Sequence, residues 1–418
     1  MDLIHAPSEK ISLGSVVPSG VQAAAAADPP TSCLLASKLL VAESTNATTA
    51  IYHPDDSREM SIQASLFIAR PPAVSNVLVW CTDSRSIEEP VIHSTHGGLI
   101  LLSLAISTNT YPFSEYYIYQ PGRCGHDGGD APSLKLVPQL KERLTCERCA
   151  VGLLSHGDRR GYHVAVLSPQ GKGEFDLCLF CSKTGTWTFK TPLLILEDGD
   201  ELPEDGDGGF IPNKVIPVGG GVLAFINLSN GILIGDVLDD SPEFHYIQLP
   251  QTDFPTPWTS YPFQTRDVSF DMSRDTIRIK FVEVVCPLDL PAWAATTWIT
   301  TITAASPWHQ LEEWDTHSII EARQLSVGDG VSIAELLPED WELHGKPEFG
   351  FLFVDMPMVS LHEDNVVCFL AKQHYLNGQS WVIAVDRVTK KVLGVHPLQT
   401  MGRSTTLFYS TISSYLNI

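Results

Sequence analysis

The sequence predicts an all-β fold. Short alternating or β-branched runs follow one another along most of the chain, and clusters of Gly, Pro, Asn and Asp separate them. Hydrophobic residues make up 44% of the 418 residues, enough for a buried core, which excludes wholesale disorder. We expect one folded domain over residues 31–418, preceded by a disordered leader at 1–30.

The first strand signals are a buried run and two hairpins. Residues 99–106 form an apolar run, which predicts one buried strand. Residues 175–181 alternate, reach a polar turn and resume at 187–189, which predicts a hairpin. Residues 222–228 and 232–238 flank an Asn-Gly dipeptide, and this dipeptide between apolar runs is a strong hairpin signal.

Further strands follow toward the C-terminus. Residues 276–284 alternate with one apolar face, and residues 296–303 are rich in β-branched side chains. Residues 381–385 lead through a polar turn into 391–395, which predicts another hairpin.

The arrangement of these hairpins favours radial repetition. No βαβ alternation is present, and an aromatic residue beside a polar turn recurs at uneven intervals, from about 55 to over 80 residues. We therefore predict an irregular β-propeller-like assembly of antiparallel hairpins with two short helices, at about 311–324 and 331–337. A distorted two-sheet β fold is the alternative.

The charge of the chain limits its partners and its compartment. Lys and Arg number 27 against 49 Asp and Glu, a formal charge of −22, which repels phosphate backbones and anionic lipids. No apolar stretch approaches the roughly 20 residues of a membrane span, and the first residues lack a secretory signal. We expect a soluble cytoplasmic or nuclear protein whose nine cysteines are reduced, with no nucleic-acid or membrane partner.

Two CxxC pairs raise the possibility of a zinc site. Cys146 and Cys149 precede Cys178 and Cys181 by 28 intervening residues, longer than the roughly 15–20 of common zinc ribbons. On an alternating strand Cys178 and Cys181 face opposite sides, whereas a zinc knuckle needs both thiolates on one metal. Free thiols are the main interpretation, and a zinc-stabilised module around residues 124–181 is an alternative.

Other motifs are predicted to be structural. Residues 218–224 match G-x-G-x-x-A, but a hairpin follows where a dinucleotide site needs a helix N-terminus. His93 and His96, three residues apart, are expected where a strand enters a turn, and residues 155–158 in a hairpin turn. The acidic run 197–209 fails the EF-hand register, which predicts a solvated loop.

The tryptophans and carboxylates suggest where other proteins or substrates bind. Most of the nine tryptophans are expected to pack between sheets, but Trp258 and Trp293 lie in proline-flanked stretches, and we predict that they line an exposed interaction surface. The sequence selects no carboxylate pair for hydrolysis, and no cofactor or small-molecule ligand is inferred.

The chain resembles a plant family known as domain of unknown function 1618, which is greatly expanded in grasses. The most specific similarity covers 215–221 and 230–250, with further matches at 266–268, 279–283 and 380–386. The family-typical block runs from about residue 150 to 400. The chain departs from typical members at Ser229 and Asn230, where they carry an aromatic and a basic residue, and at Cys181, where they carry serine.

The resemblance implies no catalytic residues. Some members are similar to the propeller-like region that follows an F-box in ubiquitin-ligase adaptors, but no F-box helical segment is recognised in this sequence, so adaptor function is an analogy. The expected function is a non-catalytic, propeller-like interaction module with a protein partner. A hydrolase that uses carboxylates on the propeller face and the zinc-stabilised module are the alternatives.

Overall fold

The computed structural model describes most of the chain. The described residues are 29–54, 61–82, 87–106, 114–122, 130–140, 150–156, 161–171, 173–196, 202–203, 210–250, 261–272, 276–286, 292–303, 312–334, 336, 349–373, 379–398 and 405–416. The predicted leader at 1–30 and the acidic run 197–209 therefore lie almost entirely outside them.

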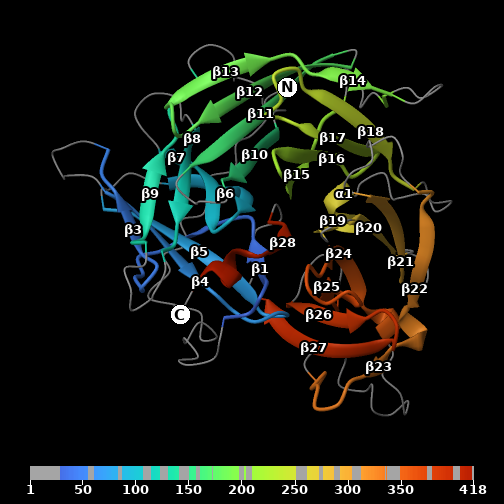
Figure 1. The fold of residues 1–418 in the computed structure, drawn as a ribbon. Helices are drawn as coiled ribbons and strands as arrows, with labels where there is room; N and C mark the ends of the chain where they lie inside the picture. Colours follow the sequence, from blue (N-terminus) through green and yellow to red (C-terminus); the bar gives the residue numbers. More distant parts are fainter. Residues whose placement is uncertain are drawn as a thin grey trace, which may run out of the picture.

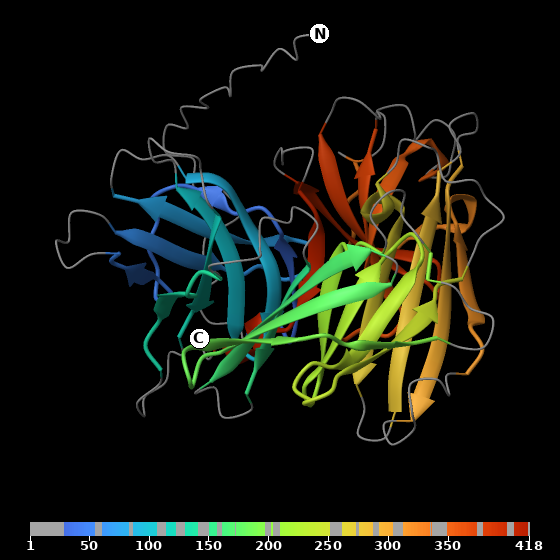
Figure 2. The same ribbon diagram turned by 90° about the horizontal axis from the view of Figure 1, so that it is seen from above.

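Six small sheets are arranged in a ring, as Figure 1 shows along its axis and Figure 2 from above. Within each sheet the strands are mainly antiparallel, and each sheet runs from the centre of the ring to its rim. The β-propeller-like prediction is confirmed, and six separate sheets set aside the two-sheet alternative.

We number the sheets as blades 1 to 6 in chain order. Blade 1 has the strand order β28-β1-β5-β4-β3, with β2 also paired to β5. Blades 2 and 3 are four-stranded meanders. The strands of these blades are β1 Cys33–Ala36, β2 Leu40–Val41, β3 Ala50–Tyr52, β4 Ile62–Phe67, β5 Val74–Cys81, β28 Leu407–Ser410, β6 Ile87–His96, β7 Leu99–Ile106, β8 Ser114–Gln120, β9 Ser133–Leu136, β10 Ala150–Ser155, β11 Tyr162–Gly171, β12 Glu174–Cys181 and β13 Thr186–Lys190.

Blades 4, 5 and 6 complete the ring. Their strands are β14 Leu193–Ile195, β15 Lys214–Gly219, β16 Val222–Asn227, β17 Gly231–Asp236, β18 Glu243–Gln248, β19 Arg266–Met272, β20 Thr276–Val285, β21 Ala294–Thr303, β22 Asp315–Glu321, β23 Ser326–Val327, β24 Phe353–Val359, β25 Val366–Lys372, β26 Ser380–Asp386 and β27 Lys391–Leu398. The helical elements are α1 Pro262–Thr265 and the 3₁₀ turns η2 Ala322–Gln324, η4 Phe349–Phe351 and η5 Ile412–Tyr415.

The predicted hairpins form where the sequence places them. β12 and β13 pair across the turn at 182–185, β16 and β17 across the Asn-Gly turn, and β26 and β27 across 387–390. The buried strand at 99–106 is β7, with the bounds that the apolar run predicts.

The two predicted helices are wrong. Residues 315–321 form the strand β22, which pairs with β21, and only η2 is helical in the described part of 311–324. Thr316, Ile319 and Ile320 are β-branched, and burial of Ile320 against blade 6 outweighs the local helical preference of the acidic residues before it. Of the helix predicted at 331–337 the structure describes residues 331–334 and 336, and none of these is helical: residues 331–333 have no regular secondary structure, and residues 334 and 336 lie in turns.

The ring closes by strand pairing between the two ends of the described chain. β28, the last strand, pairs antiparallel with β1, the first, from Cys33 opposite Ser410 to Ala36 opposite Leu407. On its other side β1 pairs in parallel with β5. Blade 1 thus takes its inner strand from the C-terminal end of the chain, so the propeller is incomplete until the last strand has been added.

Each seam between neighbouring blades contains its own hydrophobic core. Six apolar clusters fill the seams 1/2, 2/3, 3/4, 4/5, 5/6 and 6/1. Because both faces of a blade are covered, its strands read as nearly continuous apolar runs, as in β7 and β25.

The inner strands also contact one another around the axis. Thr95 Oγ1 and Ser410 Oγ are 2.8 Å apart across seam 1/2, and the Ser155 backbone N–H donates to His96 Nδ1 at 2.9 Å across seam 2/3. Asp267 joins three blades: one carboxylate oxygen accepts from Lys214 Nζ at 2.5 Å, and the other accepts from the Val359 backbone N–H at 3.1 Å. These contacts fix the inner strands relative to one another.

Short parallel strands cover the outer edges of two blades. β14 pairs with β18 at the edge of blade 4, and β23 pairs with β27 at the edge of blade 6. In blade 1, β2 also pairs in parallel, but with the interior strand β5 and beyond β1 rather than at the outer edge. Such strands occupy backbone groups that would otherwise template pairing with another chain.

Removal of residues 405–418 should abolish cooperative folding. The truncated chain lacks β28 and the buried side chains of Leu407, Ile412 and Leu416, each worth about 1.5–3 kcal/mol, against a total stability of about 5–15 kcal/mol for a typical protein. Thermal unfolding followed by circular dichroism measures the effect, with a chain that lacks only residues 417–418 as the control. An unchanged melting temperature would contradict the closure described above.

Candidate functional site

The helix α1 lies near the centre of the ring, on the face where the inner strands begin (Figure 1). Its side chain Phe263 is half-buried and packs against the apolar clusters of both seam 4/5 and seam 6/1. Only seam 5/6 lies between these two seams, so Phe263 connects two apolar clusters on either side of it. We call this face of the molecule the α1 face.

Tyr261 is an exposed aromatic side chain supported by this helix. Its ring stacks on Phe263, with ring centroids 5.4 Å apart and an angle of 10° between the planes, while 65% of the residue is exposed. The Tyr261 backbone N–H donates to Gln264 Oε1 at 3.2 Å, and the Gln264 N–H donates to the Tyr261 carbonyl at 2.8 Å. The stacking on Phe263 and these hydrogen bonds therefore hold the aromatic ring in place.

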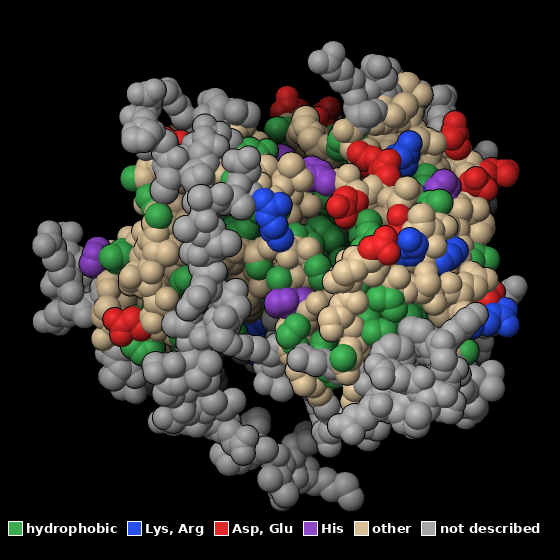
Figure 3. Space-filling model, turned by 90° about the horizontal axis from the view of Figure 1, so that it is seen from below, with side chains coloured by type: hydrophobic (Ala, Val, Ile, Leu, Met, Phe, Trp, Pro, Cys, Tyr) green, Lys and Arg blue, Asp and Glu red, His purple; other side chains and the backbone are tan. Residues whose placement is uncertain are grey.

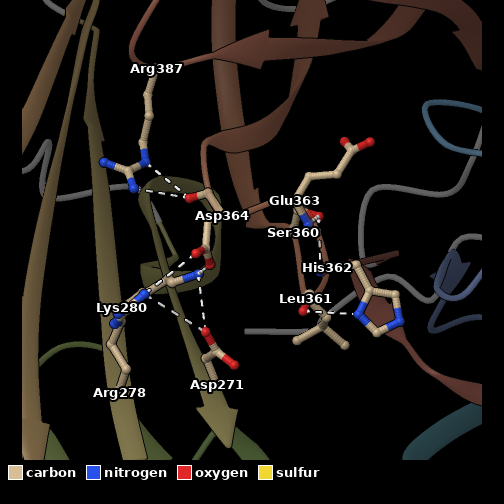
Figure 4. Close-up of polar contacts among 9 residues, drawn as sticks. All are labelled: Asp271, Arg278, Lys280, Ser360, Leu361, His362, Glu363, Asp364 and Arg387. Carbon is tan, nitrogen blue, oxygen red and sulfur yellow. Dashed lines mark hydrogen bonds and ion pairs between the residues drawn. The ribbon is translucent and has the colours of Figure 1, made fainter. Parts of the chain in front are cut away.

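A charged network joins blades 5 and 6 on the opposite face (Figure 4). Lys280 projects from β20, and its side chain is only 3% exposed. Its ammonium lies 2.7 Å from Asp364, in the β24–β25 loop, and 3.9 Å from Asp271. Arg278 reaches the same two carboxylates at 3.5 and 3.9 Å. The hydrogen bond from Lys280 lowers the pKa of Asp364.

Arg387 holds the other side of the same loop. Its Nε and Nη2 both donate to the Asp364 carbonyl, at 3.2 and 3.0 Å, and Nη1 donates to Ser318 Oγ at 3.4 Å. In Figure 4 the side chains of His362 and Glu363 point away from this network. The network thus fixes the β24–β25 loop between blades 5 and 6, and its charged side chains are engaged in these contacts.

The arrangement of these carboxylates does not favour general acid–base chemistry. Asp271 and Asp364, which the fold brings together, both face Lys280 and Arg278. Asp355 is different because burial raises its pKa, but its Oδ2 accepts from Lys372 Nζ at 2.7 Å. The hydrolase alternative remains a hypothesis without a residue pair.

The structure describes only half of the predicted zinc ligands. Cys146 and Cys149 lie outside the described residues. Cys178 is buried in the core of seam 2/3, whereas Cys181 is half-buried at the end of β12. Among the described residues, no group of three or more His, Cys, Asp or Glu is arranged to hold a metal ion. Because two of the four cysteines lie outside the described residues, the structure does not test the zinc hypothesis.

The prediction that Trp293 lines an exposed surface is corrected. Trp293 is 2% exposed, its indole N–H donates to the Phe349 carbonyl at 2.9 Å, and its ring packs on Phe369. An indole whose N–H donates to a buried acceptor can itself be buried completely. The flanking prolines do not indicate whether such an acceptor is present. Trp258 lies outside the described residues.

The glycine-rich turn and the two histidines have the structural roles that the sequence predicts, whereas the turn predicted at 155–158 lies partly outside the described residues. Gly219, Gly220 and Gly221 all have positive φ angles, and they form the turn between β15 and β16 rather than the start of a helix. His93 and His96 lie at the end of β6, and each has a hydrogen-bond partner in a neighbouring strand.

A shallow apolar cavity of about 550 Å³ lies between the outer strands β3 and β9, lined by Tyr52, Leu134, Lys135, Leu136 and Pro138. It has one charged residue and no convergent polar groups of the kind that orient a substrate.

On the side of the molecule drawn in Figure 3, acidic and basic side chains lie next to one another, so no field of a single sign is visible there. No helix in the described residues is long and apolar enough to cross a membrane.

The strand order and ring define a six-bladed propeller-like protein. Residues 225–368, from blade 4 to blade 6, match the model of a family described as "Protein of unknown function (DUF1618)". The resemblance noted from the sequence is confirmed over this segment.

Other comparisons add little. No curated protein matches the sequence. Among solved structures, prolyl oligopeptidase B from Galerina marginata is 8% identical with a TM-score of 0.24, and 81% of this chain is covered against 47% of that one. The GH32 beta-fructofuranosidase of Bombyx mori is 9% identical with a TM-score of 0.25 and coverages of 90% and 91%. The chain spans about half the length of the oligopeptidase, and TM-scores this low carry no argument about fold or function.

The sequence did not predict the charged network around Lys280 or the exposed ring of Tyr261. Nothing in the alternation of β20 indicates that Lys280 is buried, because its partner Asp364 is 84 residues away. Tyr261 had a detectable signal, since Pro262 marks the start of a short helix beside an aromatic pair.

The Asp364→Asn variant should destabilise the protein by about 2 kcal/mol. The substitution removes the nearest counter-ion of a buried ammonium, and the expected cost lies below the ~3–5 kcal/mol of a fully buried pair because Asp364 is itself exposed. Urea unfolding measures it. The double variant Lys280→Met with Asp364→Asn should recover most of the loss, whereas an equal or larger loss in the double variant would argue against the ion pair.

Acid should destabilise the fold through His93. This half-buried side chain is hydrogen-bonded to Ser103 Oγ at 2.8 Å, and burial lowers its pKa from 6.5 to about 4. As the pH falls, His93 therefore takes up a proton in the unfolded chain before it does so in the folded protein. The contribution of His93 to the free energy of unfolding is fully present above pH 6.5 and is lost as the pH falls toward 4. Urea unfolding at several pH values should show a shallower decline in His93→Gln than in the wild type, and parallel curves would contradict this role.

Proposed function

We propose that this protein is a non-catalytic protein–protein interaction module whose α1 face binds a protein partner. The supporting observation is Tyr261: a large aromatic side chain, 65% exposed, stacked on Phe263 at the centre of a rigid ring. Aromatic residues that are already ordered lose little conformational entropy on binding, which is why they are frequent among the residues that dominate interface energies.

The charge of the chain supports a basic partner. A formal charge of −22 attracts positively charged proteins over long distances and repels nucleic acids. The six described cysteines are free thiols, as expected for a reducing compartment such as the cytoplasm or nucleus. The proposed partner is therefore a protein with an apolar pocket for the tyrosine ring and a basic rim around it.

The experiment has two stages. The tagged full chain is first used to isolate partners, and a candidate is then purified and its affinity measured by calorimetry. Tyr261→Ala should weaken binding by about 30-fold, which corresponds to the loss of about 2 kcal/mol typical of an interface hot spot. Leu193→Ala is the matched control, because Leu193 is 60% exposed but lies on the outer strand β14.

If Leu193→Ala loses affinity for the partner while Tyr261→Ala keeps it, the partner binds at the rim of the ring and not on the α1 face. The melting temperature of both variants should equal that of the wild type, since both side chains are mostly exposed.

A further inference from the structure

Four chemically active side chains gather at one end of blade 3. His163 on β11 and Cys181 on β12 are cross-strand partners. The adjacent pair is hydrogen-bonded, since the Ser182 N–H donates to the Tyr162 carbonyl at 3.0 Å. His163 and Cys181 therefore form a non-hydrogen-bonded pair, in which opposite Cα atoms are only about 4.5 Å apart and both side chains lie on the same face.

A second imidazole and an ammonium complete the group. His156 Nε2 and His163 Nδ1 are 2.9 Å apart, with ring centroids separated by 4.6 Å. A Cβ atom placed on Gly161 would lie 2.7 Å from both His156 Nδ1 and the Cε of Lys183, so these two side chains converge on the same point. We call His156, His163, Cys181 and Lys183 the thiol–imidazole cluster.

The turn after β12 is suited to a thiolate. Desolvation acts to raise the pKa of Cys181, but the backbone N–H groups of Thr184 and Lys183, the Thr184 hydroxyl and the charge of Lys183 outweigh it and lower the pKa. The half-buried sulfur differs in this from buried thiols elsewhere: burial raises the pKa of Cys33 to about 11 and that of Cys368 to about 12. Low thiol pKa and access to solvent together are the conditions for cysteine reactivity.

We propose that the thiol–imidazole cluster is a site of reversible thiolation by a small anionic disulfide. The Cys181 thiol loses its proton to solvent. The thiolate then attacks one sulfur of the disulfide R–S–S–R, a new Cys181–S–S–R bond forms, the original S–S bond breaks, and R–S⁻ leaves with the electron pair. A thiol of the same class reverses the reaction. This inference is independent of the proposed binding function of the α1 face.

The surroundings select for negative charge on the disulfide. Lys183 lies in the same turn as the thiol, and the charges of both Lys183 and Lys190 act on His163, whose pKa is lowered to about 4 by burial, by His156 and by these two lysines. Carboxylates on a disulfide that approaches Cys181 would be attracted by the Lys183 ammonium, whereas a cationic disulfide would be repelled.

The test compares two disulfides on the full chain. The protein is treated with oxidised glutathione, which carries carboxylates, or with cystamine, which carries amines, and the adducts at all nine cysteines are followed over time by peptide mass spectrometry. We expect Cys181 to react about tenfold faster than the half-buried Cys286, whose pKa is raised by burial, and faster with glutathione disulfide than with cystamine.

Variants separate the cluster from simple exposure. Lys183→Gln should slow the glutathione reaction by about threefold to tenfold and reduce the preference for the anionic disulfide. Lys135→Gln, at an exposed lysine on β9, is the control and should leave the rate unchanged. Equal rates at Cys181 and Cys286, or a rate at Cys181 that Lys183→Gln does not change, would overturn the proposal.

Discussion

The pairing of β28 with β1 is the constraint on which the rest of the structure depends. A ring of blades buries its strands on both faces only if every blade has two neighbours, and blade 1 gains its inner strand from the other end of the described chain. Without this strand the cores of seams 1/2 and 6/1 would both be open, because each contains residues from the ends of the chain. Closure therefore couples segments that are more than 350 residues apart, as in Cys33 opposite Ser410.

Polar contacts fix the positions of neighbouring blades relative to one another, which apolar packing in the seams alone would leave free. Apolar packing is not directional, so neighbouring blades could slide, whereas a hydrogen-bonded ion pair has a preferred distance and angle. Arg266 Nε donates to the buried Glu283 at 2.7 Å and its Nη1 donates to the Leu228 and Ser229 carbonyls, which locks blade 5 to the hairpin turn of blade 4. Lys280 and Asp364 do the same between blades 5 and 6, and Asp267 joins blades 4, 5 and 6 near the axis.

This rigidity has a consequence for function. When the blades are fixed, the groups that remain available for recognition lie at the ends and edges of strands rather than within the sheets. Tyr261 on one face and the thiol–imidazole cluster at a turn of blade 3 are both of this kind. We propose non-covalent contact with a protein for the first and covalent chemistry with a small molecule for the second, and neither proposal requires the propeller itself to move.

The sequence by itself determined the strands, the hairpins and the absence of a helix after the glycine-rich turn, because side-chain alternation and turn residues act over short distances. It failed at residues 315–321, where pairing with β21 decided the conformation, and at Trp293, whose buried hydrogen-bond acceptor Phe349 is 56 residues away. None of the groups in the charged network, at Tyr261 or in the pairing of His163 with Cys181 could be assembled from sequence, although Cys181 itself was singled out. Only the tertiary structure decided these, since a contact between distant residues depends on how the ring closes and not on local preference.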